Sequence, residues 1–117
     1  MRHDPATILL YRPVNQQELD LIAAANWLAF PPRLPEQSIF YPALNQEYAA
    51  QIVRDQNVSF YGAGYVLRFA IDADYAAQFP VQSVGNRQHD ELWVPAEELA
   101  EFNQHIVGQI EVIAVFQ

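Results

Sequence analysis

The sequence contains no cysteine and no lysine, and only four glycines in 117 residues. Without cysteine, disulfide bonds, thiolate catalysis and cysteine-ligated zinc are excluded. Six arginines carry all the fixed positive charge against fourteen acidic residues, which leaves a formal net charge of −8. Nucleic-acid affinity depends on clustered cations that release counterions from phosphates. Because the arginines are scattered along an acidic chain, we expect no general nucleic-acid binding.

Long hydrophobic runs are also missing. No apolar stretch approaches the roughly 18 residues that a membrane-spanning helix needs. The first fourteen residues lack the apolar region and cleavage site of a signal peptide. We therefore expect no membrane partner and a cytoplasmic location. The length fits a single domain, 1–117, large enough to bury a core without cross-links.

The N-terminal part predicts a strand followed by a helix. Alternating apolar residues indicate a strand over Thr7–Arg12, which Pro13 is expected to end. Asn15, with Glu18 three residues later, predicts an N-cap and a partial capping box for a helix that reaches about Asn26. The helix is expected to face the core through Leu19, Ile22 and Ala23.

Further elements follow from the same rules. Caps or first turns at Asn45, Asp72 and Pro95 predict three more helices, the last of which Gly108 is expected to end. A Gly-Asn turn at Gly85 and Asn86 separates two strands. The expected later strands are 38–42, 64–71, 81–84, 91–94 and 109–116. This order predicts an α+β fold, with a mixed, mainly antiparallel sheet and three to four helices packed on it.

Several kinds of site are absent from the sequence. It has no G-x-G-x-x-G motif or regular βαβ alternation, which argues against a dinucleotide-binding Rossmann domain. It also has no G-x-S-x-G motif for a serine nucleophile. His89 and Glu91 share one strand face and could offer two metal ligands, whereas His3 and His105 lack such spacing. We therefore expect no metal site.

Polar residues gather before the apolar "LWV" segment. The stretch "NRQHDELWVP" places His89 and Glu91 on one face of a strand, and Gln88 and Asp90 on the other. One interpretation is a solvated strand end, since charged strand ends are common. The other is a working carboxylate at Glu91, beside apolar groups that alter its basicity and field.

Several arginines and aromatic residues could likewise have either a structural or a ligand-binding role. Arg12 either covers the core edge with its stem or forks a phosphate or carboxylate. Arg68 is expected to point outward from a half-exposed sheet. The "FPPR" segment that ends at Arg33 is more often a rigid loop than a ligand clamp. Aromatic residues at the core or its edge are expected to include Trp27, Phe30 and Tyr41.

Four segments together resemble a known family. They are "LYRPVNQQELDLI", "FPPRLPEQSIFYPALNQEYAAQIVRD", "GYVLRFAID" and "VGNRQHDELWVPAEELAEFNQHIVGQIEVI". These segments resemble a family of small bacterial proteins that carries an ADP-ribosylation/crystallin label. The layout more distantly resembles the ADP-ribosyltransferase fold, which the resemblance therefore implies for this single domain.

The resemblance also implies roles for particular residues. Arg12 matches the first-strand cation that grips NAD, and Tyr41 falls where an aromatic residue packs on nicotinamide. Glu91 matches the catalytic glutamate of a late strand. His89, two residues before it where Gln or Glu is usual, is assigned with Glu91 to the catalytic set. Arg33 is assigned with Arg12 and Tyr41 to the NAD-binding set. The Ser-Thr-Ser segment of that fold is replaced here by "YPALN".

The implied function is that of an NAD-binding, ADP-ribosyltransferase-like protein. NAD would be a substrate that is cleaved or transferred at its nicotinamide–ribose bond, either to water or to an acceptor such as a protein. The alternative is a non-catalytic module of the same fold that binds a nucleotide or a protein. A third interpretation is an interaction protein whose acidic surface docks a basic partner.

Overall fold

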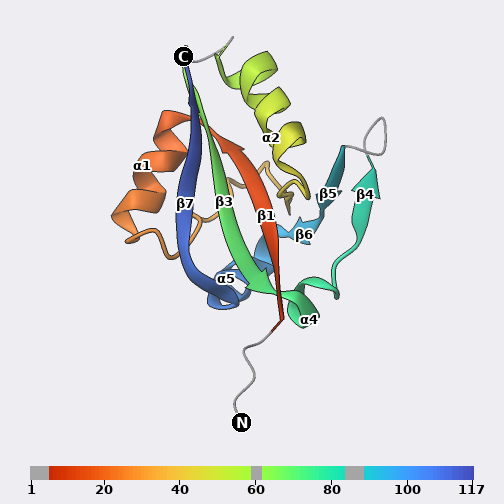
Figure 1. Ribbon diagram of the computed structural model, residues 1–117. Coiled ribbons are helices and arrows are strands. Elements are labelled where there is room, and N and C mark those ends of the chain that lie inside the picture. The colour runs from red at the N-terminus through yellow and green to blue at the C-terminus, as the bar shows by residue number, and fades with distance from the viewer. Residues whose placement is uncertain (1–5, 59–61, 84–88) are drawn as a thin grey trace.

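A three-stranded antiparallel sheet forms the centre of the molecule (Figure 1). The computed structural model describes residues 6–58, 62–83 and 89–117. In the sheet, β3 (Gly64–Asp72) lies between β1 (Thr7–Val14) and β7 (Ile106–Phe116). All strand pairs within the described ranges are antiparallel. The expected α+β class and the mainly antiparallel pairing are confirmed, whereas the parallel pair of a mixed sheet is not seen among the described strands.

Two short strand pairs extend this arrangement beyond β1. One pairs β2 (Ile39–Phe40) with β6 (Val94–Pro95), and the other pairs β4 (Val81–Ser83) with β5 (Asp90–Leu92). Ala43 forms single antiparallel bridges to Tyr11 of β1 and to Glu91 of β5. The 81–84 and 91–94 strands were therefore expected in nearly the right places, but their Gly85–Asn86 turn lies outside the described residues.

Four α-helices are described, and their caps largely follow the sequence. Asn15 accepts a hydrogen bond from the Glu18 amide, Asn45 from the Tyr48 amide, and Asp72 from the Asp74 amide. A π-helical segment, Val53–Asn57, continues α2, and a 3₁₀ turn, Ala96–Glu98, leads into α5. The helices are α1 (Gln16–Ala24), α2 (Gln46–Ile52), α4 (Ala73–Ala76) and α5 (Leu99–Gln104). None of the described helices is long and apolar enough to cross a membrane.

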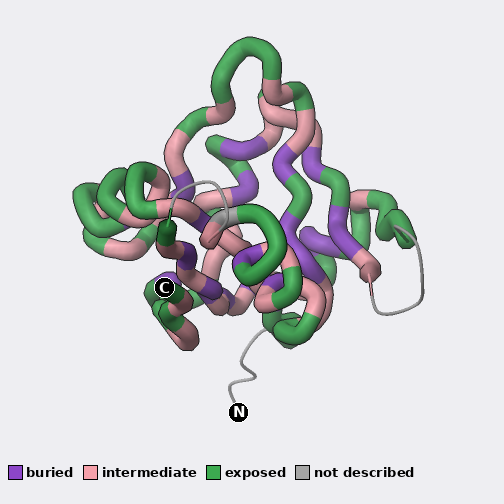
Figure 2. Tube along the Cα trace, turned by 90° about the horizontal axis from the view of Figure 1, so that it is seen from above, coloured by how far each residue is buried: buried purple, intermediate pink, exposed green. Residues whose placement is uncertain are grey.

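Helices cover both faces of the sheet. Leu67 and Phe69 of β3 face a core shared with Ile22 of α1 and Phe102 of α5. Val66, on the opposite face, packs with Ala49 and Val53 below α2. Figure 2 shows buried positions concentrated on the central strands. The predicted alternation along β3 is thus confirmed, but Ala23 of the predicted α1 stripe is exposed.

Pro13 does not end the first strand, contrary to expectation. β1 continues to Val14, and Pro13 lies opposite Val66 of β3. The Tyr11 amide and carbonyl bond to Ala43, away from β3, at 2.9 and 2.7 Å. Pro13 has the same orientation two residues later, so its missing N–H falls on the side away from β3. Proline therefore costs the β1–β3 ladder no hydrogen bond.

Gly108 does not end the last helix, which stops at Gln104. The strand β7 begins at Ile106, and Gly108 lies within it at φ +77°. Its register against β3 shifts there, because Ala70 pairs with Val107 whereas Arg68 pairs with Glu111. Glycine adopts this backbone conformation without steric cost, which is what a β-bulge requires.

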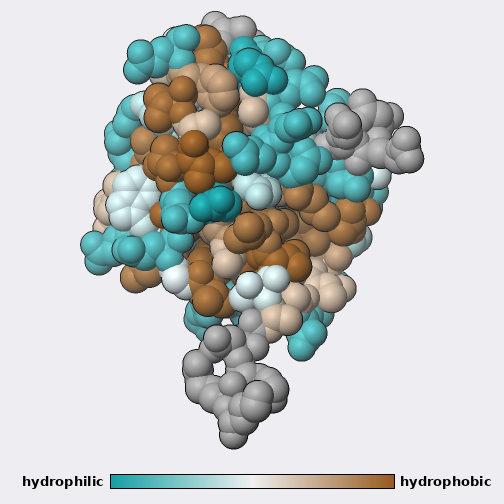
Figure 3. All heavy atoms as spheres, in the orientation of Figure 1, coloured by the Kyte–Doolittle hydropathy of each residue, from teal (hydrophilic) through white to brown (hydrophobic). Residues whose placement is uncertain are grey.

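Part of the outer sheet face is apolar and exposed. Leu9, Ala70 and Val107 form one cross-strand row, and Leu9 and Val107 are among the exposed large hydrophobics. In the next row, Arg68 pairs with Glu111 at 3.1 Å, which confirms that Arg68 points outward. Figure 3 accordingly shows hydrophobic and hydrophilic areas alternating over the sheet.

Asn103 fastens the loop after α1 to α5. Its Oδ1 accepts from the Phe30 amide at 2.9 Å, and its Nδ2 donates to the Phe30 carbonyl at 3.0 Å. Replacing Asn103 with alanine leaves both backbone groups unpaired, at about 1–3 kcal/mol for each fully buried group. We expect a loss of about 2 kcal/mol in urea unfolding. The exposed neighbour Gln104→Ala should change stability by less than about 0.5 kcal/mol, and equal losses would contradict this role for Asn103.

Candidate functional site

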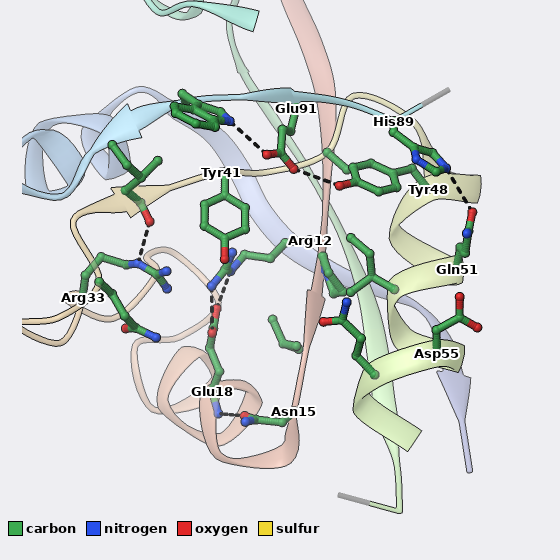
Figure 4. Close-up of a pocket in the computed structure, with 18 of the residues that line it drawn as sticks. Arg12, Asn15, Glu18, Arg33, Tyr41, Tyr48, Gln51, Asp55, His89 and Glu91 are labelled. Carbon is green, nitrogen blue, oxygen red and sulfur yellow. Dashed lines mark hydrogen bonds and ion pairs between the residues drawn. The ribbon is translucent and has the colours of Figure 1, made fainter. Parts of the chain in front are cut away.

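A cleft of about 1120 Å³ opens beside the β1 edge of the sheet. Its walls come from β1 and the start of α1, the loop before β2, α2, and β5 with its flanking residues. Figure 4 shows α1 and α2 on either side of this cleft. All five residues expected at a site line it, namely Arg12, Arg33, Tyr41, His89 and Glu91.

Glu91 is a nearly buried carboxylate held by two neutral donors. Its side chain belongs to a residue only 7% exposed. The Tyr48 hydroxyl donates to its Oε2 at 3.0 Å, and the Trp93 indole Nε1 donates to its Oε1 at 2.9 Å. Each carboxylate oxygen therefore has a fixed protein donor (Figure 4), while a carboxylate can accept about four bonds in all. Glu91 is thus oriented but retains acceptor capacity toward the cleft.

The environment of Tyr48 reflects this contact. Burial, followed by the hydrogen bond and charge of Glu91, raises the pKa of Tyr48 to about 12. All three causes disfavour an ionised phenol, because an ionised phenol could not donate and would repel the carboxylate. Tyr48 therefore stays a neutral donor to Glu91 at any physiological pH.

His89 reaches the same network from the residue before β5. Its ring stacks on Tyr48, with centroids 4.7 Å apart and planes at 15°. Its Nε2 lies 3.2 Å from Oε1 of Gln51, one helical turn after Tyr48. The amide oxygen calls for a donor, so this contact favours the Nε2–H form of the imidazole. The ring thus contacts the side chains that flank Glu91.

Arg12 forks a carboxylate of the protein itself. Its Nε and Nη2 donate to the two Glu18 oxygens at 2.6 and 3.0 Å, and its guanidinium lies 4.7 Å from the Phe40 ring centre. Of the two alternatives for Arg12, a surface arginine does not fit its 7% exposure, and the guanidinium does fork a carboxylate, which belongs to Glu18. In a full capping box the Glu18 carboxylate would accept a hydrogen bond from the backbone amide of Asn15, but here it binds Arg12.

The Arg12–Glu18 pair should contribute measurably to stability. Removing one partner of a buried ion pair costs about 3–5 kcal/mol, and the 21% exposure of Glu18 reduces that figure. We expect Glu18→Gln to lower the free energy of unfolding by about 2 kcal/mol in urea titrations. Asp20→Asn, on the exposed face of the same helix, is the control and should cost under about 0.5 kcal/mol. Equal effects would mean that Arg12 gains nothing from Glu18.

Arg33 supplies a second cation close to the first. Its Nε donates to the Ile39 carbonyl at 3.2 Å, and its guanidinium lies 5.8 Å from the Tyr41 ring centre. Burial, and next the charge of Arg12, lowers the pKa of Arg33. No carboxylate within the described ranges forms an ion pair with it. A half-buried cation near a second one favours an anionic ligand.

Several functional contacts were missed in the sequence. Tyr41 was expected at the core or its edge by its residue type and at a ligand site by the resemblance; it is 46% exposed and extends into the cleft. Trp93, in the apolar "LWV" segment, is 37% exposed, unlike the buried Leu92 and Val94, and donates a hydrogen bond to Glu91. The two-residue spacing of Glu91 and Trp93 on a strand already placed them on one face. Nothing in the sequence indicated that Tyr48 would reach Glu91.

Known proteins add nothing to this geometry. No family model, curated protein or solved structure matches the chain. Within the described part of the chain, no group of three or more His, Cys, Asp or Glu side chains could hold a metal ion. Of the two residues whose spacing would suit metal ligands, His89 contacts Gln51, and Glu91 accepts hydrogen bonds from Tyr48 and Trp93.

Proposed function

We propose that this chain is an ADP-ribosyltransferase-like protein that binds NAD in the cleft and cleaves or transfers it at the nicotinamide–ribose bond. One observation carries the proposal. Residues from separate parts of the chain, Arg12, Arg33, Tyr41 and Glu91, line the same cleft. Its volume of about 1120 Å³ slightly exceeds the roughly 300–1,000 Å³ common for ligand pockets, which suits a ligand as large as a dinucleotide.

The two kinds of charge in the cleft fit the two parts of NAD. Arg33 has no carboxylate partner among the described ion pairs and would bind the pyrophosphate. Arg12 uses two of its five N–H donors on Glu18, so the remaining donors could assist. Tyr41 offers an exposed ring between these cations and Glu91, where it could stack on nicotinamide.

Glu91 provides the charge that the reaction needs. When the bond between nicotinamide and ribose C1′ breaks, its electron pair leaves with nicotinamide and the ribose becomes oxocarbenium-like. A fixed carboxylate at low exposure stabilises that cation without reorganising. Water or an acceptor then forms a bond to C1′ and loses its proton to solvent. In this scheme Glu91 also accepts a hydrogen bond from a ribose hydroxyl.

The fold assignment is part of the same proposal. An arginine on the first strand, an aromatic residue after β2 and a glutamate on the late strand β5 match the order of functional residues in the ADP-ribosyltransferase fold. These three strands pair with different partners, all antiparallel, and single bridges at Ala43 bring β1 and β5 together, which supports that placement. Fold similarity does not by itself establish an activity, so the proposal depends on the residues in the cleft.

The test is direct measurement of binding and turnover. Isothermal calorimetry with NAD and with ADP-ribose measures affinity, and chromatography measures nicotinamide released from NAD over hours. We expect saturable NAD binding and release above the rate in buffer. Absence of both would disprove the function.

A non-catalytic binding module is the second candidate. The observation that favours it is the occupation of Arg12 by Glu18 and of both Glu91 oxygens by Tyr48 and Trp93. Such a module would bind NAD or ADP-ribose with similar affinity and release no nicotinamide. The calorimetry and chromatography above therefore separate the two candidates.

A further inference from the structure

The surroundings of Glu91 form a chain of contacts that begins at α2. Tyr48 and Gln51 lie three residues apart on α2, and the side chains of both contact His89. Residues three apart on a helix share a face, so one helix surface presents both partners to the imidazole. Tyr48 then donates to Glu91. The order of contacts is Gln51, His89, Tyr48 and Glu91 (Figure 4).

We infer that His89 is a positioning residue that fixes the Tyr48 ring, and that Tyr48 in turn fixes the Glu91 carboxylate. This role differs from the catalytic one that the resemblance implied for His89. The Tyr48 hydroxyl lies on the axis of its ring, so rotation about the Cα–Cβ bond is the motion that would carry it away from its contact 3.0 Å from Glu91. The stacked imidazole, with planes at 15°, restricts that rotation from one side.

Trp93 makes the arrangement asymmetric. Its indole N–H comes from the same strand region as Glu91, two residues later, and holds Oε1 locally. The hydrogen bond to Oε2 comes instead from Tyr48 of α2, a different segment of the chain. The carboxylate plane is therefore set by two donors on independently anchored segments. Without the Tyr48 hydroxyl, the Glu91 carboxylate would keep only the hydrogen bond from Trp93 and could rotate about it.

The kinetic consequences rest on the proposed function. Tyr48→Phe keeps the ring and removes only the donor, and we expect kcat for nicotinamide release to fall about 10- to 100-fold with little change in KM. His89→Ala removes the stack and should lower kcat by about tenfold. His89→Phe restores an aromatic ring and should recover most of that loss. If His89→Phe is as impaired as His89→Ala, the imidazole itself acts and the inference is wrong.

A spectroscopic test needs no activity. With ¹³Cζ-labelled tyrosine, the Tyr48 signal is assigned by its absence in Tyr48→Phe and followed by NMR up to pH 11. At that pH an ordinary tyrosine is about nine-tenths ionised, whereas a pKa of about 12 leaves Tyr48 about one-tenth ionised. Glu91→Gln should move the Tyr48 titration downward, because the carboxylate charge is gone.

These outcomes separate the inference from the function. If Tyr48 titrates like an ordinary tyrosine in the wild type, the contact to Glu91 does not persist in solution and the inference fails, whatever the activity. If Tyr48 resists ionisation and responds to Glu91→Gln while no nicotinamide is released, the contacts stand and the proposed function fails. A Tyr48→Phe variant with wild-type kcat would overturn the positioning role even in an active protein.

Discussion

Replacing Glu91 with glutamine is expected to lower nicotinamide release about 10²- to 10³-fold while NAD affinity changes only a few-fold. Glutamine has nearly the same shape but no charge, so it cannot stabilise a ribose cation. It also has one acceptor oxygen where Tyr48 and Trp93 present two donors. Calorimetry for NAD binding and a single-turnover assay for nicotinamide release measure the two effects separately.

The matched control is Glu36→Gln, which removes one negative charge from the lining of the same cleft. Glu36 is exposed, so its field is screened by solvent. We expect its turnover to stay within about threefold of wild type. A similar loss in both variants would mean that the net charge of the cleft matters and that Glu91 has no special role. Retained turnover in Glu91→Gln would remove Glu91 from the mechanism.

Replacing Phe102 with alanine is expected to be the most destabilising single change. Phe102 is fully buried, and its ring lies 5.4 Å from the Phe40 ring and 6.1 Å from those of Phe69 and Tyr75. Removing a buried phenylalanine costs about 3–5 kcal/mol, from lost transfer energy and the cavity left behind. Whole domains are stable by only about 5–15 kcal/mol, so much of the folded population could be lost.

Urea unfolding measures this loss, with an unchanged slope showing that the folded state keeps its compactness. Phe102→Leu retains most of the volume and should cost less than half as much. The partly exposed Phe79 offers a second comparison, because its ring packs edge-on against the same cluster, with its centroid 6.3 Å from that of Phe102. If Phe79→Ala costs as much as Phe102→Ala, Phe102 is not the centre of the core.

Local signals predicted the regular elements well. Each predicted cap at Asn15, Asn45 and Asp72 is present, because capping depends on neighbours within three residues. The alternation along β3 is likewise a local property. Proline and glycine were misjudged because their effect depends on context. Pro13 is harmless only because its nitrogen faces away from β3, and Gly108 forms a bulge instead of a helix end.

The candidate site could be predicted only as single residues. Arg12 and Glu91 stood out because each charge interrupts an apolar pattern. Their partners could not be assigned, because Tyr48 lies 43 positions from Glu91 and its spacing on α2 equally suited a core residue. Glu18 was interpreted as a capping residue, and only the structure shows that its carboxylate forms an ion pair with Arg12. Pairing between distant segments follows from topology, which local patterns do not specify.

The single residue Ala43 also limits how this cleft could change. Tyr11 and Ala43 exchange two backbone hydrogen bonds, while the flanking Pro42 carbonyl and Leu44 amide bind Leu92 and Asp90. Arg12, Tyr41 and Glu91 are each attached within two residues of these bonds. The distance between the cationic part of the cleft, at Arg12, and the anionic part, at Glu91, is therefore set by backbone hydrogen bonds. Side-chain substitutions can change what is recognised at either end, but a ligand of different length would require an insertion or deletion in the Pro42–Leu44 segment.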